Sequence, residues 1–123
     1  MRVRDLMSDK PITVGPETLM LDARQRMREE RIRHLIVTDG GRVVGIVTDR
    51  DVRLNLPSPA TSLSVWEMND LVARLTVGEV MTRSVLVVDP ARSAAEAARI
   101  MLEHKISALP VTEGERLVGI VTE

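Results

Sequence analysis

The sequence predicts an α+β fold made of two copies of a β-α-β-β-α unit. Residues 3–49 align with residues 77–123 without a gap, and 18 of the 47 aligned positions are identical. Each copy contains short apolar runs joined by glycine-containing turns, and one stretch with apolar residues at helical spacing. Because a unit this short rarely buries enough apolar surface alone, we expect the copies to share a core. A duplicated unit also favours a site between its copies.

The composition is that of an ordinary globular protein, with 44% hydrophobic and 28% charged residues. The 17 Lys and Arg residues nearly balance the 18 Asp and Glu residues, so no nucleic-acid partner is expected. No cysteine is present, which excludes disulfides and thiol catalysis. Without a long apolar run or a signal-like N-terminus, we expect a cytoplasmic protein that does not bind membranes. Trp66 is the only aromatic residue, so a purine would be held by aliphatic side chains and backbone groups.

Each copy is predicted to begin with a short lead-in and a short strand. The lead-ins, residues 4–7 and 78–81, are expected to be a helical turn or extended chain. The strands are predicted over residues 12–14 and 85–88. Pro16 and Pro90 should end them, because proline fixes φ and has no N–H to donate.

A helix is predicted after each of these strands. In the first copy Leu19, Ala23 and Met27 recur every four residues and should face the core. The buried stripe of the second helix is predicted to contain Ala94, Ala97, Ala98, Met101 and Leu102. Ser93 followed by Glu96 predicts a capping box at the start of this helix.

A hairpin is predicted after each helix. It pairs residues 35–38 with 43–47 in the first copy, and residues 109–112 with 117–121 in the second. Glycines in the turns supply the positive φ that a tight hairpin requires. Gly45 and Gly119 fall inside strands, where we expect them to permit tight packing of a helix on the sheet. The alternative is close approach by a ligand or by the partner helix. A closing helix is predicted over residues 49–54 of the first copy.

The chain is expected to divide into a first repeat (residues 1–56), a connector (57–76) and a second repeat (77–123). Residues 62–74 of the connector have apolar residues at helical spacing. Glu123 aligns with the first residue of the closing helix of the first copy. We therefore expect the second repeat to be truncated before its last helix, which leaves room for a C-terminal output domain beyond Glu123.

Each copy resembles a CBS motif, and the tandem pair resembles a Bateman module. The matching segments are residues 5–7 and 79–81, then 32–37 and 106–111, and finally the Gly-Ile-Val-Thr-Asp-Arg-Asp run at 45–51. The connector also resembles that of AcuB-type acetoin-utilisation proteins. The resemblance extends over essentially the whole chain and includes two motifs in the same order.

This resemblance implies two β-α-β-β-α units related by a pseudo-twofold axis, with packed sheets and ligand clefts between them. It also implies further pairing into a homodimer. The expected function is regulatory: AMP, ADP, ATP or S-adenosylmethionine would bind as an effector and control a partner or attached domain.

Thr48 and Asp51 are the centre of the predicted ligand site. A helix that begins near Asp49 offers free backbone N–H groups to a phosphate, and the Thr48 hydroxyl can add another hydrogen bond. The Asp51 carboxylate can accept hydrogen bonds from ribose hydroxyls. The alternative is purely structural, with Thr48 as the N-cap and Asp51 as its capping partner.

Other predicted ligand contacts lie before the strands of the first copy. Arg33 and His34 can donate to phosphate oxygens, and the alternative for both is a solvated surface position. Adenine recognition is assigned to backbone groups around Lys10 and Pro11 and to the aliphatic side chain of Ile12; the alternative for Ile12 is a core position.

The second copy departs from this pattern. Ser107 and Ala108 replace the basic pair, and the Asp partner of Thr122 would lie at position 125, beyond the chain. We therefore expect one good site around Thr48 and Asp51, and a second site with Thr122 that is weak or empty.

The alternative to a regulatory module is a structural homodimerisation unit with no physiological ligand. An enzyme is not expected, because the sequence has no P-loop, no metal-ligand constellation and no nucleophile paired with a base. We accordingly predict no catalytic residue and no metal.

Overall fold

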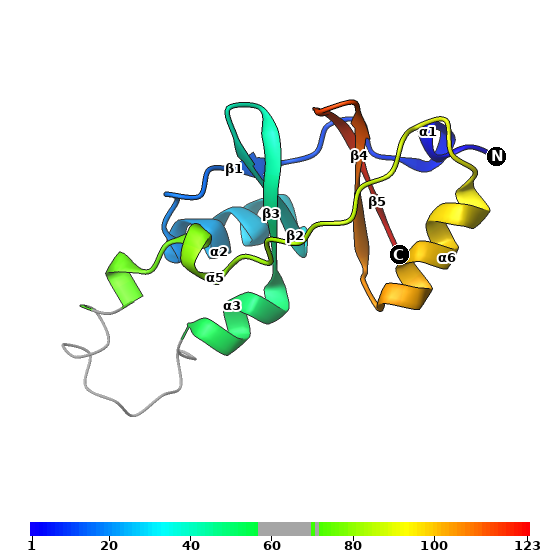
Figure 1. Cartoon of the computed structure of the whole chain (residues 1–123). Helices are drawn as coiled ribbons and strands as arrows, with labels where there is room; N and C mark the ends of the chain where they lie inside the picture. The colour runs from blue at the N-terminus through cyan, green and yellow to red at the C-terminus, as the bar shows by residue number, and fades with distance from the viewer. Residues whose placement is uncertain (57–69, 71) are drawn as a thin grey trace.

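The computed structural model describes residues 1–56, 70 and 72–123 (Figure 1). The elements in chain order are α1 (Val3–Leu6), β1 (Thr13–Val14), α2 (Met20–Glu30), β2 (His34–Asp39), β3 (Arg42–Thr48), α3 (Asp49–Asn55), α5 (Val77–Val80), α6 (Ala94–His104), β4 (Ala108–Glu113) and β5 (Arg116–Thr122). They form one sheet in the order β1-β2-β3 and a second sheet of β4 and β5. The predicted α+β fold is confirmed. The helix predicted over residues 62–74 lies mostly outside the described residues.

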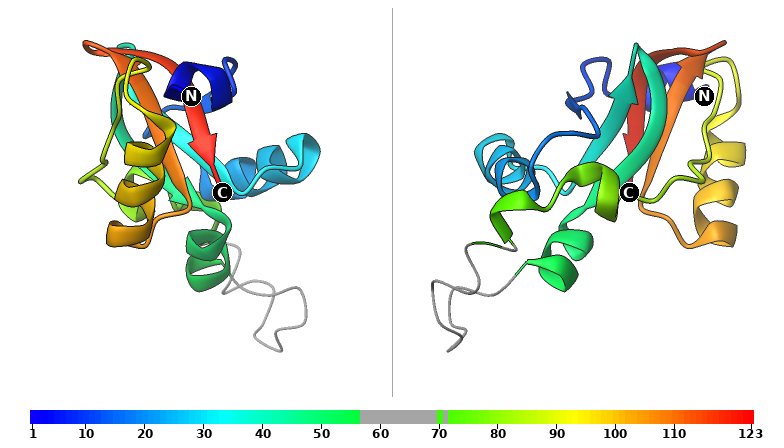
Figure 2. Two further views of the ribbon diagram at one scale, coloured as in Figure 1. Left: turned by 90° about the vertical axis from the view of Figure 1, so that its right-hand side faces the viewer. Right: turned by 60° about the vertical axis from the view of Figure 1, so that its left-hand side comes forward.

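The two hairpins are the most similar parts of the repeats. Strands β2 and β3 pair antiparallel with a bulge between Val37 and Thr38, and β4 and β5 repeat this with a bulge between Val111 and Thr112. Gly40 and Gly114 have φ values of 60° and 61°, as the predicted tight turns require. The two hairpins lie side by side, with β3 against β5 (Figure 2).

The first strand of the second repeat is not formed as predicted. Residues 85–87 lie outside any strand, and only Val88 makes a parallel bridge, to Val111. In the first repeat the N–H of Ile36 donates to the carbonyl oxygen of Ile12 at 3.4 Å. The residue aligned with Ile36 is Pro110, which has no N–H to donate. This missing donor explains the shorter pairing.

The predicted helix stripes are partly wrong. Leu19 precedes the first turn of α2 and is 36% exposed, and Met20 takes the buried position beside Ala23 and Met27. In α6 the buried residues are Ala97 and Met101, whereas Ala98 is exposed and Leu102 is 80% exposed. Residues one position apart differ by about 100° around a helix, so the prediction had drawn the stripe too wide.

The hydrophobic core is divided into two clusters, one for each hairpin and its helix. The first contains Met20, Leu35, Val47, Val77 and Met81 among its buried residues. The second contains Val3, Ala97, Met101, Leu109 and Val121. Val77 and Met81 belong by sequence to the second repeat, and Val3 belongs to the first. Each lead-in, which in the structure comprises residues 3–8 or 77–82, therefore completes the core of the other repeat.

Backbone hydrogen bonds fix this exchange in nearly identical ways on both sides. The N–H of Val3 donates to Arg92 O at 2.8 Å, and its counterpart Val77 donates to Thr18 O at 2.7 Å. Farther along, Ser8 exchanges two hydrogen bonds with Ile120, and Thr82 exchanges two with Ile46. Figure 1 shows α1 beside α6, and α5 beside β3.

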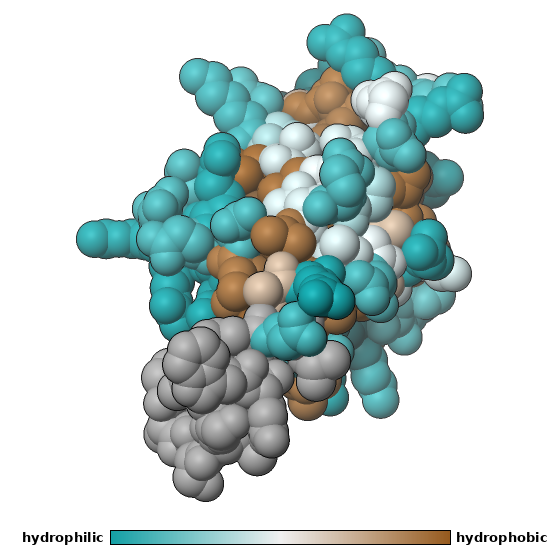
Figure 3. Space-filling model, turned by 90° about the vertical axis from the view of Figure 1, so that its left-hand side faces the viewer, coloured by the Kyte–Doolittle hydropathy of each residue, from teal (hydrophilic) through white to brown (hydrophobic). Residues whose placement is uncertain are grey.

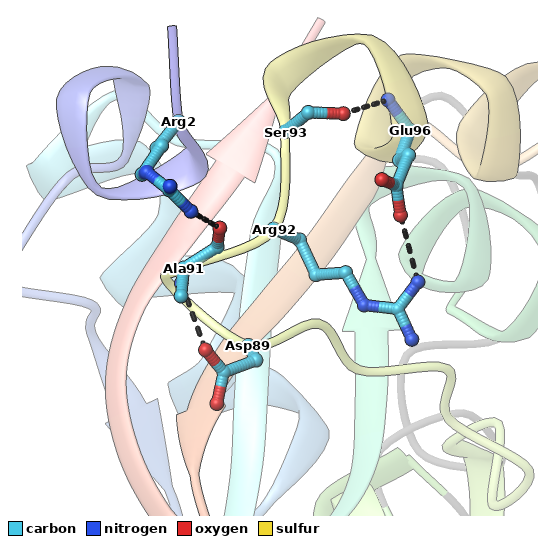
Figure 4. A network of polar contacts seen from close by, with 6 residues as sticks. All are labelled: Arg2, Asp89, Ala91, Arg92, Ser93 and Glu96. Atoms are coloured by element: carbon cyan, nitrogen blue, oxygen red, sulfur yellow. Dashed lines mark hydrogen bonds and ion pairs between the residues drawn. The ribbon is translucent and has the colours of Figure 1, made fainter.

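Side chains reinforce the docking of the first lead-in at the start of α6 (Figure 4). The Arg2 guanidinium donates to the carbonyl oxygen of Ala91. The Ser93 hydroxyl accepts from the N–H of Glu96 at 3.1 Å, which is one half of the predicted capping box. The other half is replaced, because the Glu96 carboxylate pairs with Arg92 at 2.7 Å. The hydrogen bond from Arg92 also lowers the pKa of Glu96.

Gly45 and Gly119 lie where the exchanged lead-ins cross β3 and β5. A Cβ on Gly45 would lie 2.8 Å from Met81 Cγ and 3.0 Å from Thr82 O. A Cβ on Gly119 would lie 2.7 Å from both Met7 Sδ and Ser8 O. The predicted close packing is thus present, and its partner is the lead-in of the other repeat. Among the described residues, no helix has the length and apolarity needed to span a bilayer.

Gly45→Ala and Gly119→Ala are each expected to lower the free energy of unfolding by about 1–3 kcal/mol, because the new methyl group would overlap backbone as well as side chain. Urea denaturation measures this change. Ala98→Ser, on the exposed face of α6, is the control and should stay within about 0.5 kcal/mol of the wild type. A glycine variant as stable as this control would show that the lead-ins are not docked as described.

Candidate functional site

A cavity of about 650 Å³ lies between the two repeats. The first repeat contributes residues 10–12 just before β1, residues 31–33 between α2 and β2, the first residue of β2 and the first residue of α3. The second repeat contributes the residue before β4 and the end of β5. The lining residues are Leu6, Ser8, Lys10, Pro11, Ile12, Arg31, Ile32, Arg33, His34, Asp49, Ser107, Ile120, Thr122 and Glu123.

Six of the eight ligand-binding residues predicted from the sequence line this cavity. They are Lys10, Pro11, Ile12, Arg33, His34 and Thr122. Thr48 and Asp51, the centre of the predicted site, are not among the lining residues. The cavity combines the first strand of one repeat with the last strand of the other, so Thr122 occupies the place that the prediction gave to Thr48.

Thr48 and Asp51 form a capping box at the start of α3. One carboxylate oxygen of Asp51 accepts from the Thr48 N–H at 2.9 Å and from the Thr48 hydroxyl at 3.2 Å. The Thr48 hydroxyl in turn accepts from the Asp51 N–H at 3.3 Å. This is the geometry of the structural alternative that the sequence left open, and it satisfies N–H groups at the start of the helix.

His34 connects the two repeats across the cavity. Its Nε2 atom lies 2.7 Å from the hydroxyl oxygen of Ser107, which is the residue aligned with Arg33. The imidazole is half-buried, and burial is the main reason why the pKa of His34 lies below its usual value of 6.5. Arg33 lowers this pKa further, while Asp49 and Glu123 oppose the shift. The side chain is therefore largely uncharged at neutral pH.

The cavity wall carries three permanent cations and two carboxylates. The cations are those of Lys10, Arg31 and Arg33, and the carboxylates belong to Asp49 and Glu123. Sequence reasoning missed the two carboxylates, although the repeat alignment pairs them with each other directly after Thr48 and Thr122. Equivalent backbone hydrogen bonds fix both residues: Asp49 N donates to Arg33 O at 2.9 Å, and Glu123 N donates to Ser107 O at 3.2 Å.

The comparison with protein families explains the repeated architecture. The model of the CBS domain family matches residues 3–58 and 77–123. The chain belongs to the CBS domain family. It carries a tandem CBS pair, as the sequence resemblance predicted.

Solved CBS structures match the fold of this pair. A putative acetoin utilization protein (AcuB) from Vibrio cholerae is 32% identical, with a TM-score of 0.80 over 99% of this chain and 84% of that chain. CBSX2 in complex with AMP is 34% identical, with a TM-score of 0.81 over 99% of this chain and 90% of that one. The CBS pair of MJ0100, in complex with 5′-methylthioadenosine and S-adenosyl-L-methionine, is 28% identical, with a TM-score of 0.79 over 99% and 89% of the two chains.

Curated relatives include both short and long proteins. The uncharacterized protein MJ1404 of Methanocaldococcus jannaschii is 34% identical over 98% of this CBS pair, which spans only 30% of that protein. The uncharacterized protein MJ1426 of the same organism is 32% identical, and the match extends over 99% of this chain and 86% of the relative. CBS pairs of this kind thus occur within much longer proteins as well as forming most of a short one.

Within the described part of the CBS pair, no group of three or more His, Cys, Asp or Glu side chains is arranged to hold a metal ion. A related solved structure, that of Hypoxic Response Protein I, contains two coordinated zinc ions and is 31% identical, with a TM-score of 0.76 over 99% of this chain and 92% of that one. The two histidines of the present chain, His34 and His104, are far apart in sequence, and His34 is already hydrogen-bonded to Ser107.

Asp51→Ala is expected to lower the free energy of unfolding by about 1 kcal/mol, because it removes the capping box of α3. Thermal or urea unfolding measures the loss. Asp22→Ala changes the acidic residue in the first turn of α2 and serves as the control, since Asp22 is exposed and makes no capping box. Equal losses in the two variants would show that the Asp51 contacts add nothing beyond the charge near a helix N-terminus.

The stability of the free protein is expected to decrease as the pH falls below about 6.5. Because burial lowers the pKa of His34 in the folded chain, the unfolded chain takes up this proton first. The contribution of His34 is present above the unfolded-state pKa and is lost as the pH falls through the folded-state pKa. Urea denaturation between about pH 7.5 and about pH 5 measures this change. The free energy of unfolding should fall less with decreasing pH in His34→Gln than in the wild type. His104→Gln, at an exposed position, should follow the wild type, and three equal slopes would contradict the assignment.

Proposed function

We propose that this CBS pair is a regulatory module that binds an adenosine-type ligand in the cavity between its repeats. The observation that carries the proposal is a cavity lined by both repeats, with cationic and aliphatic residues on its wall. Its volume of about 650 Å³ suits a small nucleotide. The AMP complex of CBSX2 and the S-adenosylmethionine complex of MJ0100 support the ligand class.

The chemistry of the wall suggests how such a ligand would lie. Arg33 offers a planar fork to phosphate oxygens, and Lys10 adds a point charge. Pro11 and Ile12 provide an aliphatic surface and backbone groups for the base. The Thr122 hydroxyl and the adjacent carboxylates are suitable partners for ribose hydroxyls.

Regulation would follow from the contact that one ligand makes with both repeats. A ligand that fits one relative arrangement better than another shifts the population towards that arrangement. The first lead-in takes part directly, because Leu6 and Ser8 line the cavity while Ser8 is hydrogen-bonded to Ile120 of the second repeat. A partner or attached domain that contacts either repeat would respond to this shift.

Thr48 and Asp51 are proposed to belong to a second ligand position. The cavity combines Pro11 and Ile12 with Thr122, so the pseudo-twofold relation pairs the aligned residues Val85 and Leu86 with Thr48. A ligand there would compete with the hydrogen bonds of the capping box. We therefore propose that this position is the weaker of the two.

The alternative, a structural homodimerisation unit, is favoured by exposed leucines on the helices. Leu54 on α3 is 71% exposed and Leu102 on α6 is 80% exposed. On the face shown in Figure 3, however, hydrophobic residues lie among hydrophilic ones.

Melting temperatures measured with AMP, ADP, ATP, S-adenosylmethionine and 5′-methylthioadenosine distinguish the regulatory from the structural function, because a ligand that binds the folded state raises the melting temperature. No rise with any of the five would favour the structural alternative.

Arg33→Ala is expected to weaken AMP binding about tenfold, because a hydrogen bond to a charged group contributes about 1.5–3 kcal/mol, less where the site is partly solvated. Isothermal titration calorimetry measures the dissociation constant. Arg26→Ala is the matched control, since Arg26 pairs with Glu30 on α2 and does not line the cavity. If the two variants bound AMP equally well, the phosphate would not lie at Arg33.

A further inference from the structure

His34 occupies the point where both repeats and the cavity meet. It is the first residue of β2, lines the cavity, and contacts Ser107 of the other repeat at 2.7 Å. The aligned residue of the second repeat is Ala108, so this position carries an imidazole in the first repeat only.

The charges around His34 come from several elements and partly cancel. Lys10 lies before β1, and Arg31 and Arg33 lie between α2 and β2. Asp49 begins α3, and Glu123 follows β5. Three cations face two carboxylates on the cavity wall, so the entry of an anion changes the local balance of charge strongly.

The hydrogen bond to Ser107 can persist in both protonation states of His34. An uncharged Nε2 without hydrogen accepts from the serine hydroxyl, and a protonated Nε2 donates to the same oxygen. The hydroxyl hydrogen rotates to suit, so a proton can be gained without breaking the contact between the repeats. Protonation therefore changes the charge of the cavity and leaves this link in place.

We propose that His34 takes up a proton when an anionic ligand enters the cavity, so that the ligand binds more tightly as the solution becomes mildly acidic. This inference rests on the proposed function. In the empty cavity burial keeps the imidazole uncharged. A phosphate nearby supplies the opposite charge that favours imidazolium. By thermodynamic linkage, the factor by which the bound anion raises the proton affinity of His34 equals the factor by which protonation of His34 raises the affinity for the anion.

The first test is an NMR titration of the imidazole signals with and without saturating AMP. The chain contains two histidines, so His104 serves as an internal reference. We expect AMP to raise the pKa of His34. An unchanged His34 titration in the presence of bound AMP overturns the inference.

The second test is calorimetric titration with AMP near pH 7 in two buffers of different ionisation enthalpy. The wild type and His104→Gln should take up a fraction of a proton on binding, and His34→Gln should take up less. From about pH 7.5 to about pH 5.5, AMP affinity relative to that of His34→Gln should increase about threefold to tenfold, the range expected for one nearby opposite charge in a partly solvated site. Comparison with the variant removes the effect of the titration of the AMP phosphate itself.

The outcomes distinguish failure of the proton-uptake inference from failure of the proposed function. AMP binding with equal proton uptake by wild type and His34→Gln overturns the inference and leaves the proposed function intact. Absence of AMP binding at every pH overturns the proposed function for this ligand, and the inference with it. A folded Ser107→Ala variant should still take up the proton, because the imidazole and the cavity charges remain. Loss of proton uptake in that variant would contradict the direct role of His34.

Discussion

The exchange of lead-ins between the two repeats is the constraint on which the rest of this structure depends. Val3 is fully buried in the core of the second repeat, and Val77 is fully buried in the core of the first. Fully burying a valine contributes about 1.5 kcal/mol or more, so neither repeat keeps its core intact if its partner moves away. Gly45 and Gly119 allow this exchange, since any larger residue would meet the backbone of the crossing segment.

The same exchange determines how the cavity is built. The segment from Val3 to Ser8 packs on the second repeat, and the chain must then return to the first repeat to form β1. Lys10, Pro11 and Ile12 lie on this return path, next to the end of β5. A cavity between the repeats is thus bordered by the crossing segment itself. A ligand in it would contact the chain that holds the two cores together.

Sequence patterns predicted the hairpins and most helix positions, because periodicity and glycine turns report local conformation. They could not predict the exchange, since the pattern that marks Val3 and Val77 as buried is the same whichever core receives them. The grouping of residues around the cavity differs from the expectation for this reason. Thr48 was grouped with Ile12 because both belong to the first repeat, whereas the crossing chain brings Thr122 to the cavity that Ile12 lines. The carboxylates of Asp49 and Glu123 were missed because a first-turn acid is also an ordinary helix feature.

The duplicated backbone and the divergent side chains have different consequences for function. The backbone hydrogen bonds of Val3 and Val77 have nearly the same length, and so do those of Ser8 and Thr82. The backbone of the two repeats is therefore close to symmetric. The chemistry is not symmetric, because Pro110 removes a strand donor that Ile36 provides, and Ala108 stands where the first repeat has His34. Under the proposed function, an imidazole at only one of two equivalent positions would give those positions unequal affinity for the same anion. A ligand at the tighter position would then shift the population towards the arrangement of the repeats that it fits best.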